Sequence, residues 1–116
     1  MAGLFKYPKR KLRKMIAAGD YAEALEFGRS LERSHGRDPD YLFIMGSAHY
    51  VLGDAAESSR YFERALEINP YDADSMLLLA RLYAHAGKTK EARGLCKRML
   101  DADPENAEAG ELLDSL

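Results

Sequence analysis

The chain has 116 residues, of which 47% are hydrophobic and 31% are charged; this mixture excludes a disordered chain and predicts one globular domain. Its single cysteine, Cys96, excludes an intramolecular disulfide and fits a reducing compartment, so we expect a cytoplasmic protein. No apolar run approaches the ~20 residues that a membrane span needs.

The net charge of −2 is unevenly distributed along the chain. Residues 1–14 hold six basic residues and no acidic residue, whereas the remainder holds 11 basic and 19 acidic residues. Such a basic N-terminal arm suits an acidic peptide, a phosphate backbone or an anionic membrane surface. It also suits a solvated first helix that neutralises an acidic body, and the sequence leaves these alternatives open.

The first expected helix pair occupies residues 5–38. Gly19 ends its first helix, because a left-handed residue is favoured at that position. Asp20 follows with Glu23 three residues later, which is the spacing of a capping box at the start of the second helix.

The second expected pair occupies residues 39–72. Asp38 and Pro39 open it as an N-cap followed by proline in the first turn. Gly53 ends the first helix of this pair, and Asp54 begins a second capping box. Asn69 and Pro70 then close the unit.

The third pair occupies residues 73–106, and residues 107–116 form a seventh helix. In this last helix Leu112, Leu113 and Leu116 cover the preceding unit, while acidic residues face water, as a terminal capping helix requires. No segment alternates polar and apolar residues between turn signals, so we expect no strands.

A 34-residue repeat connects these pairs, and its clearest marks are three glycines at the same step: Gly19, Gly53 and Gly87. The period and the residues within it resemble the tetratricopeptide repeat family. The middle unit matches the family pattern at Leu42, Met45, Gly46, His49, Ser58, Phe62, Ala65 and Pro70. The third unit matches at Met76, Leu79, Ala80, Tyr83, Ala92, Cys96 and Pro104. The first unit is degenerate, because Pro8, Lys11 and Gly28 stand where large apolar residues are usual.

The resemblance implies an all-α fold, a right-handed α-solenoid of three helix pairs and a C-terminal capping helix, seven helices in all. Residues 1–116 would form one domain in which each helix pair buries its apolar face against the next pair. Small residues such as Gly46 and Ser58 would let the two helices of a unit approach closely.

Residue patterns that carry catalysis are missing from the sequence. His49 occupies the aromatic position that Tyr83 fills one unit later, so we expect it to pack rather than to bind a ligand. Cys96 occupies the position of Phe62, which predicts a buried and unreactive thiol. We therefore expect no enzymatic activity, no cofactor and no metal.

The resemblance also implies that the first helix of each pair lines a concave, peptide-binding face. On the helix that begins at Pro39, Phe43, Ser47 and Tyr50 form a stripe that neither of the two packing faces uses. The repeat step adds the equivalent positions of the other units. The predicted groove consists of Lys9, Arg13, Phe43, Ser47, Tyr50, Leu77 and Arg81. The alternative is that Phe43, Tyr50 and Leu77 pack between units.

One subfamily of these domains clamps the C-terminal carboxylate of chaperone tails with lysine, asparagine and arginine side chains. Lys9 matches its first lysine, but Arg13 and Ser47 replace the two asparagines. Asp74 and Leu78 replace the basic pair of the third unit, and Asp74 would repel a carboxylate. Binding of chaperone tails is therefore disfavoured.

The preferred interpretation is a non-catalytic adaptor that binds a protein or peptide ligand in the concave groove, with an acidic ligand as one alternative. A second interpretation is a nucleic-acid or ribosome-surface binder that uses the basic arm, but its few aromatic residues and the acidic body make nucleic acid an unfavourable partner. A third is structural self-assembly into a homo-oligomer through open solenoid ends.

Overall fold

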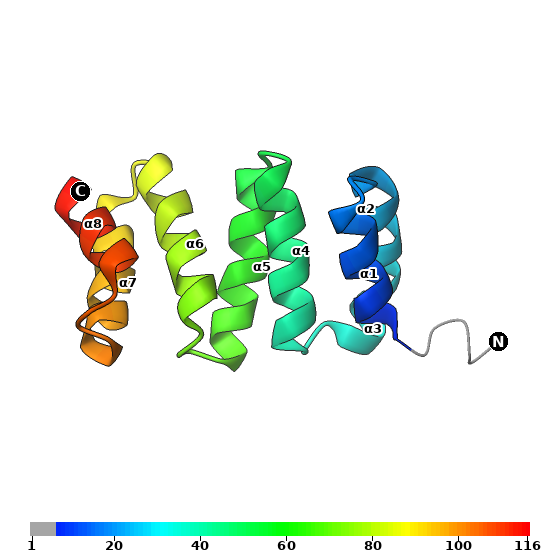
Figure 1. Ribbon diagram of the computed structural model, residues 1–116, viewed down its shortest axis with the longest axis horizontal. Coiled ribbons are helices and arrows are strands. Elements are labelled where there is room, and N and C mark those ends of the chain that lie inside the picture. Colours follow the sequence, from blue (N-terminus) through cyan, green and yellow to red (C-terminus); the bar gives the residue numbers. More distant parts are fainter. Residues whose placement is uncertain (1–6) are drawn as a thin grey trace. The chain divides into compact units, whose positions relative to one another are not determined.

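Helices make up all the regular structure of the computed structural model, which describes residues 7–116 (Figure 1). Eight helices follow one another in this range, and the range contains no strand. The all-α expectation is therefore confirmed. The chain divides into two compact units, residues 1–61 and residues 62–116, and the boundary falls within helix α5 (Ala55–Ile68).

The first unit is built around a helix pair and a third long helix. Its elements are α1 (Pro8–Ala17), α2 (Tyr21–Ser30), α3 (Glu32–His35), α4 (Pro39–Val51) and the first half of α5. Helices α1 and α2 pack against each other, and both also contact α4 (Figure 1). Ser58 of α5 donates a 2.8 Å hydrogen bond to the backbone carbonyl of Gly46 on α4, the close approach that these two small residues predict.

The turn glycines have the backbone conformation that the repeat predicts. Gly19, Gly53 and Gly87 have φ angles of +83°, +78° and +80°, the region that L side chains rarely adopt. A methyl group added at any of them would meet nothing within 4 Å, so the turn needs glycine for its backbone and not for lack of space.

Two of the three expected N-caps in the first unit are confirmed. The Asp38 side chain accepts a 2.9 Å hydrogen bond from the backbone N–H of Asp40, and Asp54 accepts one of 3.3 Å from Glu57. The capping box at Asp20 is wrong, because the Asp20 side chain makes no cap hydrogen bond. Its ψ angle of 57° lies outside the extended region that aims a capping side chain at the first turn.

The expected number of seven helices is also wrong for the described residues. The four-residue helix α3 lies near the end of the first expected unit, where the sequence analysis predicts no separate helix. No proline or glycine interrupts residues 29–35, so the chain resumes helical bonding after Leu31, with His35 donating to the Leu31 carbonyl at 2.8 Å. The eighth helix therefore comes from α3.

Tyr41 is the largest fully buried side chain in the core of the first unit. Its hydroxyl donates to the backbone carbonyl of Gly28 at 2.7 Å, and Glu32 Oε2 lies 3.0 Å away as an alternative acceptor. Its ring meets the Tyr61 ring edge-on at 6.5 Å. One side chain on α4 thus connects α2, α3 and α5.

The second unit consists of the rest of α5 with α6 (Ala73–His85), α7 (Thr89–Ala102) and α8 (Ala107–Ser115). Helices α6 and α7 form a pair, and α8 packs against both (Figure 1). Asn106 caps α8 by accepting a 3.1 Å hydrogen bond from the backbone N–H of Ala109. The predicted terminal helix is therefore present, and its residue Ala109 is fully buried.

Cys96 is fully buried, like Phe62 one repeat earlier, which confirms the assignment of both to the core. Burial also raises the pKa of the Cys96 thiol and so disfavours the reactive thiolate. We expect the native protein to resist a water-soluble maleimide. Since Cys96 is the only cysteine, mass spectrometry reports on it directly, and full labelling in guanidinium chloride serves as the control. Rapid labelling without denaturant would contradict the burial.

Two further properties follow from the described residues. No helix within residues 7–116 is long and apolar enough to cross a membrane. In the same range, no group of three or more His, Cys, Asp or Glu side chains is arranged to hold a metal ion.

Candidate functional site

Helix α4 carries the three central residues of the predicted groove. Seven of its 13 residues are buried, so most of its circumference faces other parts of the protein. Phe43, Ser47 and Tyr50 are only half-buried, and they follow one another at a spacing of four and three residues. They therefore form one partly accessible stripe, as the sequence predicts.

Ser47 differs from its two aromatic neighbours. Its hydroxyl oxygen is shielded from solvent and has no hydrogen-bond partner among the described residues. A shielded hydroxyl without a partner costs free energy, which an incoming donor or acceptor would recover only after a local movement. The aromatic rings of Phe43 and Tyr50 thus provide the accessible part of the stripe.

His49 lies on another face of α4 and packs as expected. It is 7% exposed, and its ring stacks on Tyr61 with centroids 5.6 Å apart and an interplanar angle of 15°. Its Nδ1 is 3.4 Å from Asp54 Oδ2, a distance that suits an ion pair but not a well-aligned hydrogen bond. The packing role of His49 is confirmed.

The two basic residues of the predicted groove on α1 contact the beginning of α4. Lys9 Nζ lies 2.7 Å from Asp38 Oδ2 and 3.2 Å from Asp40 Oδ2. Arg13, one helical turn later, donates to the same Asp40 carboxylate. Since both acids stand at the positive end of α4, the helix dipole and the two cations stabilise their negative charges together.

The ion pair between Lys9 and Asp38 changes the pKa values of both residues. The hydrogen bond to Asp38 raises the pKa of Lys9, although partial burial opposes the change. Burial alone would raise the pKa of Asp38, but hydrogen bonds from Lys9 and from the Asp40 backbone outweigh it and lower that pKa. Lys9 and Asp38 therefore both stay charged between their two pKa values, and the contribution of this pair to stability is lost as the pH falls through the lowered pKa of Asp38.

The second unit carries the other two predicted groove residues, Leu77 and Arg81, on α6. Leu77 is half-buried, and Arg81 is exposed. The Arg81 guanidinium donates a 3.1 Å hydrogen bond to Glu108 Oε2 on α8. The structure thus gives all three cations of the predicted groove a carboxylate within their own unit.

The sequence contains a signal for these ion pairs that our reading of its motifs missed. Arg13 and Asp40 are 27 residues apart, and Arg81 and Glu108 are 27 residues apart two repeats later. From the sequence motifs alone, Asp40 is expected only to cap a helix and Glu108 only to face water. In both pairs the acid follows the arginine by the same number of residues, and the two arginines occupy equivalent positions of the repeat. Such a recurring pair indicates a contact between the first helix of one repeat and the first helix of the next.

The sequence of the chain matches a known profile. The profile described as "Tetratricopeptide repeat" matches residues 50–116, more than half of the chain. Among curated proteins, "Protein CTR9 homolog" of Arabidopsis thaliana is 25% identical over 111 residues. That match covers 89% of this chain but only 10% of the relative, so the chain spans about a tenth of the relative's length.

Solved structures of similar fold include two with bound peptides. The "First TPR of Spaghetti (RPAP3) bound to HSP90 peptide SRMEEVD" has a TM-score of 0.83 and 22% identity, covering 93% of this chain and 86% of that chain. The Yersinia enterocolitica type III secretion chaperone SycD, in complex with a peptide of the translocator YopD, has a TM-score of 0.84 and 11% identity, covering 99% and 93%. At these identities the likeness establishes the fold.

Proposed function

Because the chain belongs to the tetratricopeptide repeat family, we propose that it is a non-catalytic adaptor that holds a peptide or helix of a partner protein. The observation that carries this proposal is the half-buried aromatic stripe on α4. A helix that is otherwise largely buried keeps two aromatic rings, Phe43 and Tyr50, partly accessible. Aromatic side chains supply much of the binding energy at protein interfaces.

The comparisons support the class of ligand and leave its identity open. Two proteins of the same fold, named above, were solved with peptides. For this chain we propose a peptide whose apolar side chain lies against Phe43 and Tyr50. In the second unit, we propose that Leu77 and Arg81 contribute equivalent contacts on α6.

The ion pairs limit how much the cations of the proposed groove can contribute to binding an acidic ligand. Lys9, Arg13 and Arg81 must each exchange a carboxylate within the protein for one of the ligand. Because such an exchange replaces one ion pair by another, its net gain is small. Specificity in the groove would therefore come from the apolar contacts on α4.

The test of the proposed function is a pair of single substitutions, Phe43→Ala and Tyr50→Ala. Each should weaken binding of a captured partner by roughly 1–3 kcal/mol, the usual range for an interface aromatic, and leave helicity and melting largely unchanged. Affinity purification with the wild-type chain identifies the partner, and calorimetry with each variant measures the loss.

The matched control is Tyr71→Ala in the second unit. Tyr71 is 83% exposed, so this variant removes the same type of side chain as Tyr50→Ala from an accessible position outside α4. If it weakens binding as much as Tyr50→Ala does, the stripe on α4 is not the binding surface. If Phe43→Ala or Tyr50→Ala costs the ~3–5 kcal/mol of stability typical of a buried aromatic, that residue belongs to the core.

A further inference from the structure

Helix α1 carries more positive charge than its neighbours neutralise. Half of its ten residues are basic, and none is acidic: Lys9, Arg10, Lys11, Arg13 and Lys14. Lys9 and Arg13 pair with Asp38 and Asp40, as described above. Arg10 and Lys14 form no ion pair with any residue between 7 and 116, and both side chains are exposed.

The helical period places these two cations on one side of α1. Leu12 is the fully buried residue of the helix and marks its inner side. At 100° per residue, Arg10 and Lys14 project on the opposite side, one turn apart and separated by about 6 Å along the axis. We call these two residues, with the adjacent exposed Lys11, the outer basic face.

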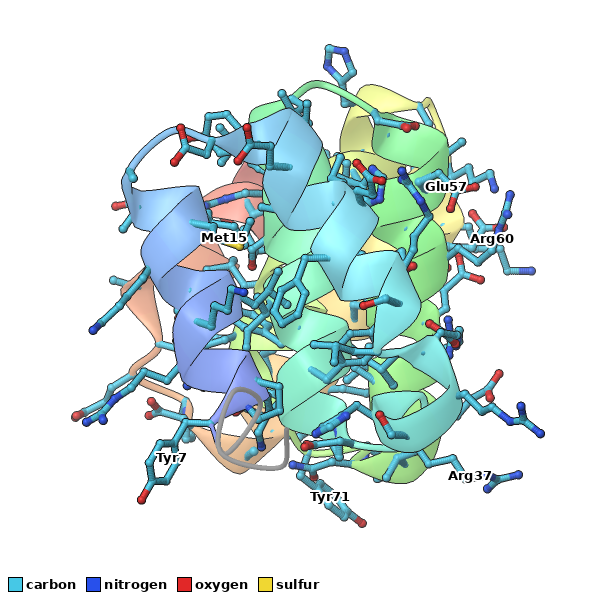
Figure 2. The ribbon with its side chains drawn as sticks, turned by 90° about the vertical axis from the view of Figure 1, so that its right-hand side faces the viewer. Tyr7, Met15, Arg37, Glu57, Arg60 and Tyr71 are labelled. Carbon is cyan, nitrogen blue, oxygen red and sulfur yellow. The ribbon has the colours of Figure 1, made fainter. Side chains whose placement is uncertain are left out.

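Aromatic rings border the outer basic face at two points. The Arg10 guanidinium lies over the Tyr7 ring, 5.4 Å from its centroid, and Lys11 Nζ lies 4.7 Å from the centroid of Phe27 on α2. Tyr7 is 57% exposed and points outward at the start of α1 (Figure 2). A cation over a ring keeps its positive charge available to an anion while the ring restricts its motion.

We propose that the outer basic face binds an acidic peptide segment of a partner, at a surface separate from the aromatic stripe on α4. The argument is charge complementarity, because two exposed cations one turn apart match carboxylates on successive turns or alternate residues of a ligand. The extent of the face favours a short acidic peptide over a nucleic acid. Neighbouring α2 exposes Glu23 and Glu26, which would repel a longer phosphate backbone.

The test uses a fluorescently labelled hexaglutamate peptide as the probe, with binding followed by anisotropy at low and at physiological salt. We expect Arg10→Glu with Lys14→Glu to weaken binding about tenfold at low salt, and the neutral pair Arg10→Gln with Lys14→Gln to weaken it less. Salt should reduce the wild-type affinity and have a smaller effect on the reversed variant.

A matched control reverses two other arginines of the same unit, Arg33→Glu with Arg37→Glu. Both are exposed and four residues apart, and Arg37 points away from the helices on the α3 side (Figure 2). This variant has the same net charge as the first, so an equal loss of binding would show a general charge effect and overturn the proposal. Circular dichroism verifies that both reversed variants fold.

Two further measurements separate this proposal from its rivals. The Phe43→Ala, Tyr50→Ala double variant should bind hexaglutamate like wild type, because the outer basic face does not depend on the stripe. Failure of the groove and failure of this face are thereby distinguishable. If a ten-nucleotide oligothymidine binds more tightly than hexaglutamate and is lost on reversal of Arg10 and Lys14, the face binds nucleic acid and the peptide proposal is wrong.

Discussion

Replacing Tyr41 by alanine should lower the free energy of unfolding by about 3–5 kcal/mol, as expected for a fully buried aromatic side chain. The ring of Tyr41 fills the space between α4 and α5, and its hydroxyl reaches the Gly28 carbonyl and the Glu32 carboxylate. Urea denaturation followed by circular dichroism measures the change. The total free energy of unfolding of a domain of this size is ~5–15 kcal/mol, so the alanine variant would be only marginally stable.

The milder variant Tyr41→Phe keeps the ring and removes only the hydroxyl. We expect a loss of about 0.5–1.5 kcal/mol, the net contribution of one hydrogen bond, because the Gly28 carbonyl still accepts from the Leu31 backbone N–H. Tyr50→Ala is the control, since Tyr50 is half-buried on the same helix and should cost less than Tyr41→Ala. A Tyr41→Phe variant as stable as wild type would show that the hydroxyl contributes nothing to the fold.

The same residue predicts a response to alkaline pH. Burial, followed by the hydrogen bond to Glu32, raises the pKa of Tyr41 above its ordinary value. Above about pH 10 the unfolded chain loses this proton and the folded protein retains it, so stability falls as the pH rises. Tyr41→Phe should therefore show a shallower decline than wild type in this range.

Gly28→Ala and Gly94→Ala should change stability in opposite directions. Both glycines lie inside helices, where alanine gains up to ~1 kcal/mol over glycine. An added methyl at Gly94 meets nothing within 4 Å, so Gly94→Ala should stabilise the protein by that amount. At Gly28 the methyl would overlap the Met45 sulfur and lie 2.9 Å from its terminal methyl, so we expect a net loss of about 1–2 kcal/mol.

A double variant checks the cause. If Met45 is what Gly28 accommodates, Gly28→Ala should cost nothing in a Met45→Ala background, although Met45→Ala alone costs ~2–5 kcal/mol. Thermal melting of the four variants provides the comparison. Equal stabilisation by Gly28→Ala and Gly94→Ala would mean that Met45 moves aside freely and that the close approach of α2 to α4 has no specific role.

Local rules predicted the parts of the fold that depend on backbone conformation. The glycine step predicted three left-handed turns, and the aspartates at 38 and 54 predicted two caps, since each feature involves residues within one turn of each other. Helix α3 was not predicted, because residues 32–35 lie at the end of the first expected unit, next to Gly36 and the start of the next unit, and carry no helix signal of their own. The resumed helix depends on Leu31 and on contacts to Tyr41 that lie outside the segment.

The candidate site was predictable where it depends on a single helix. The stripe of Phe43, Ser47 and Tyr50 follows from the period of α4, and the structure leaves all three half-buried. The charges were harder, because Lys9 and Asp38 are 29 residues apart and meet only after α1 has packed on α4. The prediction that Lys9 and Arg13 line the groove for an acidic ligand did not include their ion pairs with Asp38 and Asp40.

The turn glycines and Gly28 differ in whether a second substitution elsewhere can compensate for replacing the glycine. At Gly53 no neighbouring atom lies near the added methyl, so no substitution elsewhere relieves an L residue there. At Gly28 the obstacle is the Met45 side chain, and a smaller residue at position 45 would remove it. This difference explains why all three repeats of this chain keep the turn glycine. A packing position, in contrast, can hold a different residue when the residue that it contacts differs as well. The degenerate first repeat contains such a pair, since its Gly28 on α2 lies against Met45 on α4.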